Sequence, residues 1–165
     1  MVAVASSGTA KLTLPADDQI HITREFDAPR HHVYKAFTTP ELVKRWWASD
    51  LGEVTIAEID LRVGGTWRYV MVANEGMEVA FHGEYKELIE NERIVSTEFY
   101  EGAGPDAPPT VNTATFTETD GRTLLTVIVQ CPSPEVRNMI IESGMEHGMQ
   151  KAYDYMEQVA ISLQA

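Results

Sequence analysis

The chain has 165 residues and carries 13 Lys and Arg against 25 Asp and Glu, for a formal net charge of −12. This charge opposes binding to phosphate backbones, so we expect neither nucleic acid nor an anionic membrane as a partner. The single cysteine, Cys131, excludes an intramolecular disulfide and a thiolate zinc site, and it fits a reducing compartment such as the cytoplasm. The length suits one domain with its own core.

The first residues are rich in Ala, Ser, Gly and Thr and lack the positive charge that opens a signal peptide. We interpret residues 1–16 as a flexible leader and residues 17–165 as a single domain. The longest apolar runs of the chain are far shorter than a membrane span.

The first predicted element is a half-buried strand over residues 19–26, because apolar residues and Arg24 alternate there with polar ones. Asp27 is a plausible helix cap, and Pro29 predicts the start of a short helix. Thr39 and Pro40 repeat this arrangement and predict a second short helix directly after the first.

Strands separated by short turns follow, which predicts an antiparallel meander. The expected strands cover residues 53–59, 66–72, 77–88, 94–100, 111–119 and 123–131. After Pro134 the spacing of apolar residues predicts one helix that continues to about Leu163. A helix of roughly thirty residues spans about 40 Å, enough to cross a sheet.

Several motifs occur together in this order and resemble those of the Hsp-90 ATPase activator homologues, in the SRPBCC or START-like superfamily. The resemblance covers roughly Asp18 to Leu163. Its motifs are Phe26-Asp27-Ala28-Pro29, Ala36-Phe37-Thr38-Thr39-Pro40-Glu41-Leu42, Trp46-Trp47, Asp60-x-Arg62-x-Gly64-Gly65-x-Trp67, Gly83-x-Tyr85-x-Glu87, Arg93 and Gly144-Met145-x-x-Gly148.

The resemblance implies an α+β helix-grip fold: a curved antiparallel sheet of seven strands wrapped around a long C-terminal helix, with two short helices after the first strand. It also implies a hydrophobic cavity between sheet and helix. Members use such cavities for lipids, polyketides and other apolar ligands, and a few carry out chemistry there. The eukaryotic co-chaperone of the family joins this domain to a separate N-terminal domain, which we do not expect in this protein.

Aromatic and methionine side chains are the candidate cavity lining. Trp46 and Trp47 point about 100° apart on a helix, so we expect one in the core and the other at the cavity rim. Alternation places Trp67, Tyr69 and Met71 on one strand face. The full predicted lining is Trp46, Trp47, Trp67, Tyr69, Met71, Phe81, Tyr85, Met145, His147 and Gly148. These residues would suit a filled core equally well.

Charged residues offer few candidates for chemistry. Arg24 shares the core face of its strand, so it needs a partner if buried, and Asp60 or Glu87 could supply one. Recognition of a ligand carboxylate or phenolate by Arg24 is the alternative, with Glu87 as a second polar contact. His31 and His32 are adjacent, a spacing that does not favour a metal site on a helix.

No nucleophile–base arrangement, phosphate loop or dinucleotide motif is visible, so no residue is assigned a catalytic role and no cofactor or metal is expected. The leading hypothesis is binding of a hydrophobic or aromatic small molecule in the cavity. The alternatives are an enzyme of the polyketide cyclase or hydrolase type, and a module that activates a chaperone ATPase. Either a monomer or a homodimer fits the sequence.

Overall fold

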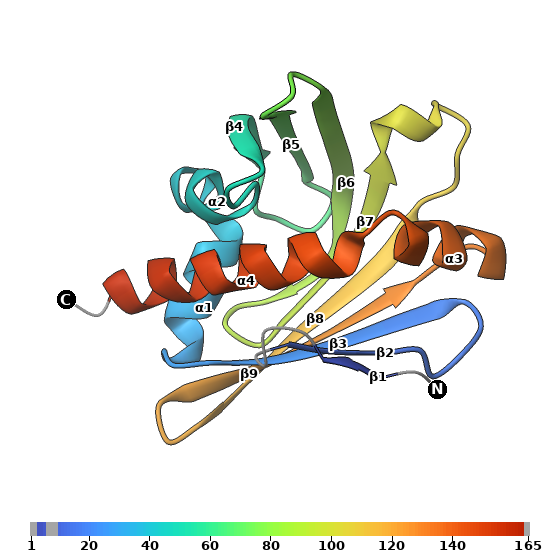
Figure 1. The fold of residues 1–165 in the computed structure, drawn as a ribbon. Coiled ribbons are helices and arrows are strands. Elements are labelled where there is room, and N and C mark those ends of the chain that lie inside the picture. Colours follow the sequence, from blue (N-terminus) through green and yellow to red (C-terminus); the bar gives the residue numbers. More distant parts are fainter. Residues whose placement is uncertain (1–2, 6–9, 164–165) are drawn as a thin grey trace.

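The computed structural model describes residues 3–5 and 10–163, and in these residues nine strands form one antiparallel sheet. The order across the sheet is β1-β2-β3-β9-β8-β7-β6-β5-β4. The strands are β1 (Ala3–Ala5), β2 (Ala10–Thr13), β3 (Gln19–Phe26), β4 (Gly52–Ile59), β5 (Thr66–Ala73), β6 (Glu78–Ile89), β7 (Arg93–Tyr100), β8 (Thr110–Thr119) and β9 (Arg122–Gln130). The helices are α1 (Arg30–Thr38), α2 (Pro40–Trp46), the 3-10 helix η1 (Glu101–Ala103), α3 (Pro134–Glu142) and α4 (Met145–Ser162). The sheet curves around α4 (Figure 1), which is the predicted α+β helix-grip arrangement.

All seven predicted strands are present, and two more precede them. The expectation of a flexible leader is wrong for Ala10–Thr13, because this segment is β2, with Leu12 opposite Ile22 of β3. Ala10 and Leu12 are each only 1% exposed, so β2 contributes to the core. Two apolar residues in four were too short a pattern to predict a strand. The leader's residues 1–2 and 6–9 lie outside the described residues.

The prolines begin the two short helices in different ways. Pro40 is the first residue of α2, as predicted, where its missing N–H costs nothing. Pro29 instead has extended backbone angles and precedes α1, which begins at Arg30, so the prediction that Asp27 caps this helix is wrong. The Asp27 N–H donates to Glu157 Oε2 of α4 at 2.8 Å.

The predicted single C-terminal helix is in fact two helices. α3 ends at Glu142 and α4 begins at Met145, and between them Gly144 has φ of 85°. A left-handed residue interrupts the helical hydrogen-bond pattern, and glycine adopts this conformation without steric cost. The apolar spacing continued across this point, which is why the sequence indicated one helix.

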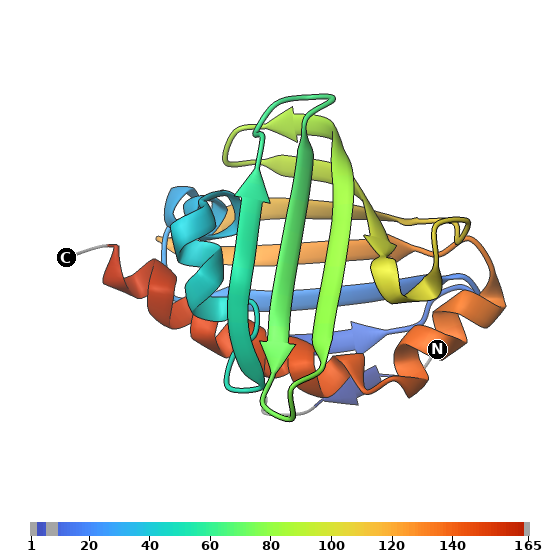
Figure 2. The ribbon, with the colours of Figure 1, turned by 90° about the horizontal axis from the view of Figure 1, so that it is seen from above.

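Polar side chains of α4 hold it across the concave side of the sheet, where Figure 2 shows it running across the strands. Gln150 Nε2 donates to the carbonyl of Ala10 at 2.9 Å, and the Ala10 N–H donates back to Gln150 Oε1 at 3.3 Å. Gln150 is only 3% exposed, so these bonds satisfy amide groups that would otherwise be costly to bury. They fix α4 against β2.

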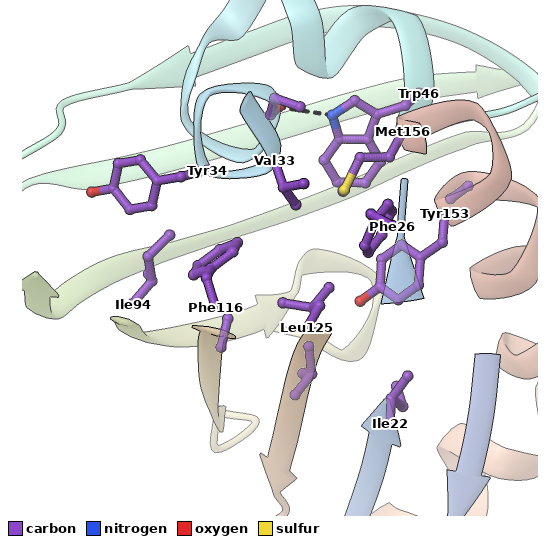
Figure 3. Close-up of a cluster of buried hydrophobic side chains, with 14 of the residues drawn as sticks. Ile22, Phe26, Val33, Tyr34, Trp46, Ile94, Phe116, Leu125, Tyr153 and Met156 are labelled. Carbon is purple, nitrogen blue, oxygen red and sulfur yellow. Dashed lines mark hydrogen bonds between the residues drawn. The ribbon is translucent and has the colours of Figure 1, made fainter. Parts of the chain in front are cut away.

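The core lies between the concave face of the sheet and helices α1, α2 and α4 (Figure 3). Phe26 of β3 and Tyr153 of α4 meet edge to face, with ring centroids 6.0 Å apart. Trp46 of α2 is 5% exposed, and its Nε1 donates to the Ala36 carbonyl at 2.9 Å. Burial of each such side chain contributes roughly 1.5–3 kcal/mol.

Candidate functional site

Five aromatic rings form a continuous series on the concave face, from the core to the molecular surface. Trp67 and Tyr69 of β5 have ring centroids 4.8 Å apart, and Trp47, which follows α2, lies 5.5 Å from Tyr69. Phe81 of β6 lies 5.7 Å from Trp47 and 5.2 Å from Tyr100, the last residue of β7. Trp67 is 7% exposed and Tyr100 is 48% exposed. We call these five residues the aromatic row.

The two adjacent tryptophans have different environments. Trp46 is buried in the core, whereas Trp47 is half-buried and contacts Tyr69 and Phe81 of the aromatic row. Strands β5 and β6 and the end of α2 thus bring together four of the residues that the sequence placed in the lining, Trp47, Trp67, Tyr69 and Phe81.

The concave face also carries a carboxyl group, that of Glu98 on β7. Glu98 lies opposite Thr110 of β8, two residues beyond the Ser96–Asn112 pair. The Asn112 amide donates to Glu98 Oε1 at 3.4 Å, a long hydrogen bond. Glu98 is half-buried, and burial raises its carboxyl pKa, opposed by the bond from Asn112. Among the described residues, no cation contributes to the pKa of this group.

Tyrosine hydroxyls surround the same region. Burial, then the phenol of Tyr85, then the carboxyl of Glu98 raise the pKa of Tyr69, whose hydroxyl donates to that of Tyr85. Burial, and next the Glu98 carboxyl, raise the pKa of Tyr153 on α4. Glu98, on the concave face of β7, is therefore within electrostatic range of phenols from both the sheet and α4.

The indole N–H of Trp67, on β5, is a buried donor on the same face of the sheet as this carboxyl. Within the part of the chain that the structure describes, no acceptor hydrogen-bonds to Trp67 Nε1. A Cβ on Gly83 would lie 2.7 Å from Nε1 and would also meet the Thr97 carbonyl oxygen, so the indole lies over a residue that must be glycine. Gly83 sits between the pairs His82–Phe99 and Tyr85–Ser96, next to Glu98 on the neighbouring strand.

Arg24 is a structural cation, and its predicted partners are wrong. It is 2% exposed, and its guanidinium lies 3.1 Å from Asp154 and 2.9 Å from Glu157, both on α4. Asp60 instead pairs with Arg62 in the connection between β4 and β5, and Glu87 of β6 pairs with Arg93 of β7. The sequence could not identify these partners because the two α4 carboxylates are 130 or more residues away from Arg24.

The other predicted lining residues lie in varied places. Tyr85 is buried at 4% exposure, while Met71, Met145 and Gly148 are half-buried, and Met145 packs against the core. His147 is exposed. Near Gly148, the Leu51 Cδ1 atom is 3.8 Å from where a Cβ would lie, which is an ordinary contact distance.

Sequence reasoning missed Glu98, Asn112, Tyr153 and the unpartnered N–H of Trp67. Alternation along β7 was an available signal, because Glu98 has the same parity as the buried Ile94. Tyr153 had no such signal, and it is 8% exposed although the nearby Tyr155 on the same helix is 41% exposed.

A second ionic cluster lies on the convex face and is separate from the aromatic row. Arg68 donates to both oxygens of Glu101, at 2.9 and 3.0 Å, and His82 Nδ1 lies 2.9 Å from Glu101 Oε2. The Arg68 hydrogen bonds, followed by that of His82, lower the pKa of Glu101 to about 2. This cluster attaches η1 to β5 and β6.

Two further kinds of feature are absent from the described residues. None of their helices is both long and apolar enough to cross a membrane. Nor do the described side chains include three or more His, Cys, Asp or Glu residues grouped as ligands for a metal ion.

Comparisons with solved structures show the same fold in several bacterial proteins. A Nitrosomonas europaea protein is 23% identical, covering 92% of this chain and 99% of its own, with a TM-score of 0.82. A Rhodobacter sphaeroides protein is 22% identical, covering 93% and 99%, with a TM-score of 0.84. A Mycobacterium smegmatis protein is 24% identical, covering 96% and 95%, with a TM-score of 0.79.

A search of curated proteins found no match. The family model described as "activator of Hsp90 ATPase homolog 1-like protein" matches residues 27–160, which include both short helices, the strands from β4 onward and nearly all of α4. With the helix-grip arrangement of sheet and helix and its structural relatives, this match shows that the chain belongs to the family of activator of Hsp90 ATPase homolog 1-like proteins.

Proposed function

We propose that this protein binds an apolar or aromatic small molecule between the curved sheet and α4. The aromatic row carries the proposal. It supplies ring faces and edges at spacings of 4.8 to 5.7 Å, within the usual range for aromatic contacts, and it joins the core to the surface. A bound ring would make the same contacts that the rings now make with one another.

The partial exposure of the aromatic row favours a ligand-binding surface over a filled core. Phe81 and Trp47 keep part of their surface accessible, although both pack against the hydrophobic core. Burying this surface under a ligand would contribute free energy at about 25 cal/mol per Å². Apolar walls with a few polar groups are typical of small-molecule sites.

A fluorescent binding assay tests the proposal. The neutral probe N-phenyl-1-naphthylamine gains fluorescence in an apolar environment, and we expect saturable binding to the intact protein. Replacing Phe81 by alanine removes one ring of the row, so we expect the affinity to fall about tenfold, the equivalent of about 1.4 kcal/mol.

Phe99→Ala is the matched control, because Phe99 is on the same sheet but stacks on His82, on the convex face. Its affinity for the probe should equal that of the unmodified protein. Circular dichroism and thermal melting confirm that both variants are folded. Absence of saturable binding, or an equal loss in both variants, would overturn the proposal.

A further inference from the structure

The interior end of the aromatic row holds two polar groups that the proposed function does not use. One is the Glu98 carboxyl, with a single long hydrogen bond from Asn112. The other is the Trp67 N–H, 7% exposed as a residue and without an acceptor in residues 3–5 and 10–163. Buried polar groups without good partners are rare in folded proteins, and each costs free energy.

Trp67 of β5 and Glu98 of β7 share the concave face, and β6 lies between their strands. Nε1 of Trp67 lies over Gly83, and Gly83 neighbours Glu98 across the β6–β7 pair. Neighbouring strands lie about 4.8 Å apart, so an indole N–H over Gly83 of β6 is about one strand spacing from the backbone of Glu98. No hydrogen bond joins the indole to the carboxyl among the described contacts. A donor and an acceptor are thus held close together without satisfying each other.

One small group satisfies both at once: a neutral hydroxyl. Its O–H donates to the carboxyl of Glu98, and its oxygen accepts from the N–H of Trp67. An ammonium group would satisfy Glu98 but would meet the positive end of the indole N–H dipole. A ligand carboxylate would be repelled by Glu98.

The adjacent phenols indicate the same chemistry. Tyr69 donates to Tyr85, so a neutral phenol is already accommodated there through one hydrogen bond. Burial raises the pKa of both phenols, because the interior disfavours the anionic form. A hydroxyl compound bound beside them would likewise remain neutral.

We infer that the ligand is an aromatic or alicyclic alcohol or phenol, whose hydroxyl lies between Glu98 and Trp67 Nε1 while its rings contact the aromatic row. This inference rests on the proposed function and specifies its substrate class. The carboxyl and the indole N–H select the hydroxyl, whereas the aromatic row supplies affinity.

Matched probes test the inference by calorimetry on the full chain. 2-Naphthol and 2-methylnaphthalene differ only by a hydroxyl in place of a methyl group, and p-cresol and p-xylene form a smaller pair. 2-(Aminomethyl)naphthalene supplies the cation. We expect the unmodified protein to bind the hydroxyl member of each pair about tenfold more tightly than its methyl partner, and more tightly than the amine.

Two variants assign the preference to named groups. Glu98→Met keeps the length of the side chain but removes the acceptor, so the preference for the hydroxyl should fall to within about twofold, while the affinity for 2-methylnaphthalene stays or improves. Trp67→Phe keeps a ring but removes the donor, and it should reduce the same preference by several-fold. Glu53→Met, at an exposed position of β4, is the matched control and should leave the preference unchanged.

The outcomes separate this inference from the proposed function. Equal affinities within each pair, a preference that survives in Glu98→Met, or tightest binding of the amine would refute the hydroxyl inference, while binding itself would still support the proposed function. Failure of every probe to bind would refute both. Binding of the methyl compounds also reports whether each variant is folded. A misfolded variant would bind neither the hydroxyl compound nor the methyl compound of a pair.

Discussion

Replacing Arg24 by methionine should destabilise the protein strongly, because this one side chain joins β3 to α4. Arg24 is 2% exposed, and its guanidinium contacts Asp154 at 3.1 Å and Glu157 at 2.9 Å. It also lies 4.9 Å from the centroid of Phe26. Methionine fills much of the same volume, so the change removes mainly the charge and the hydrogen bonds.

The expected magnitude follows from the exposure of the two partners. Removing one member of a buried ion pair costs about 3–5 kcal/mol when the remaining charge stays buried. Here the side chains of Asp154 and Glu157 are 44% and 20% exposed, so water can solvate them after the change. We therefore expect a loss of about 2–3 kcal/mol, a large share of the stability of a typical domain.

Urea unfolding followed by circular dichroism measures this loss. Arg93→Met is the matched control, because Arg93 pairs with Glu87 at 2.7 Å but both side chains are 43% exposed. Exposed pairs contribute about 0–1 kcal/mol, so the control should change little. A loss below about 1 kcal/mol in Arg24→Met, or an equal loss in both variants, would refute this account of the helix attachment.

Further predictions concern the helix break, the convex cluster and the thiol. Gly144→Ala should lower the free energy of unfolding by about 1–2 kcal/mol, because Gly144 has φ of 85°. Gly148→Ala should raise it by up to about 1 kcal/mol, because Gly148 lies inside α4. Changes of the same sign in urea unfolding would contradict the helix boundaries. The pKa of Glu101 is about 2, below its ordinary value of 4.5. The ionised Glu101 carboxylate therefore contributes its full stabilisation when the pH is above 4.5, and this stabilisation is lost as the pH falls toward 2. Because Glu101 and Arg68 are partly exposed, we expect only about 1 kcal/mol, and acid titration of Glu101→Gln should lack this component. Cys131 is 2% exposed, and burial raises the pKa of its thiol. A disulfide reagent should therefore modify this thiol only as fast as the protein unfolds. Rapid modification of the native protein would show that the thiol lies at the surface.

Local patterns in the sequence predicted most of the architecture. Alternation along residues 19–26 correctly placed Ile20, Ile22, Arg24 and Phe26 on the buried face of β3, since a strand turns successive side chains to opposite faces. Pro40 correctly marked the start of α2. Alternation also placed Trp67 and Tyr69 on one face of β5, and both belong to the core cluster.

Predictions failed where local patterns compete with packing. Gly144 fitted a helical face by spacing, yet the chain turns there with a left-handed residue to carry α4 across the sheet. β2 was missed because a short strand is stabilised by its neighbour β3 and by Gln150 of α4, which no local pattern reveals.

The sequence by itself determined the family, the fold class and the aromatic character of the concave face, because strand alternation, helix starts and turn residues are local properties. Only the tertiary structure decided which side chains meet. It paired Arg24 with Asp154 and Glu157, and it placed the carboxyl of Glu98 and the N–H of Trp67 on one face of the sheet, on either side of Gly83 of β6. Such meetings depend on strand register and helix docking, which arise from contacts between residues far apart in the chain.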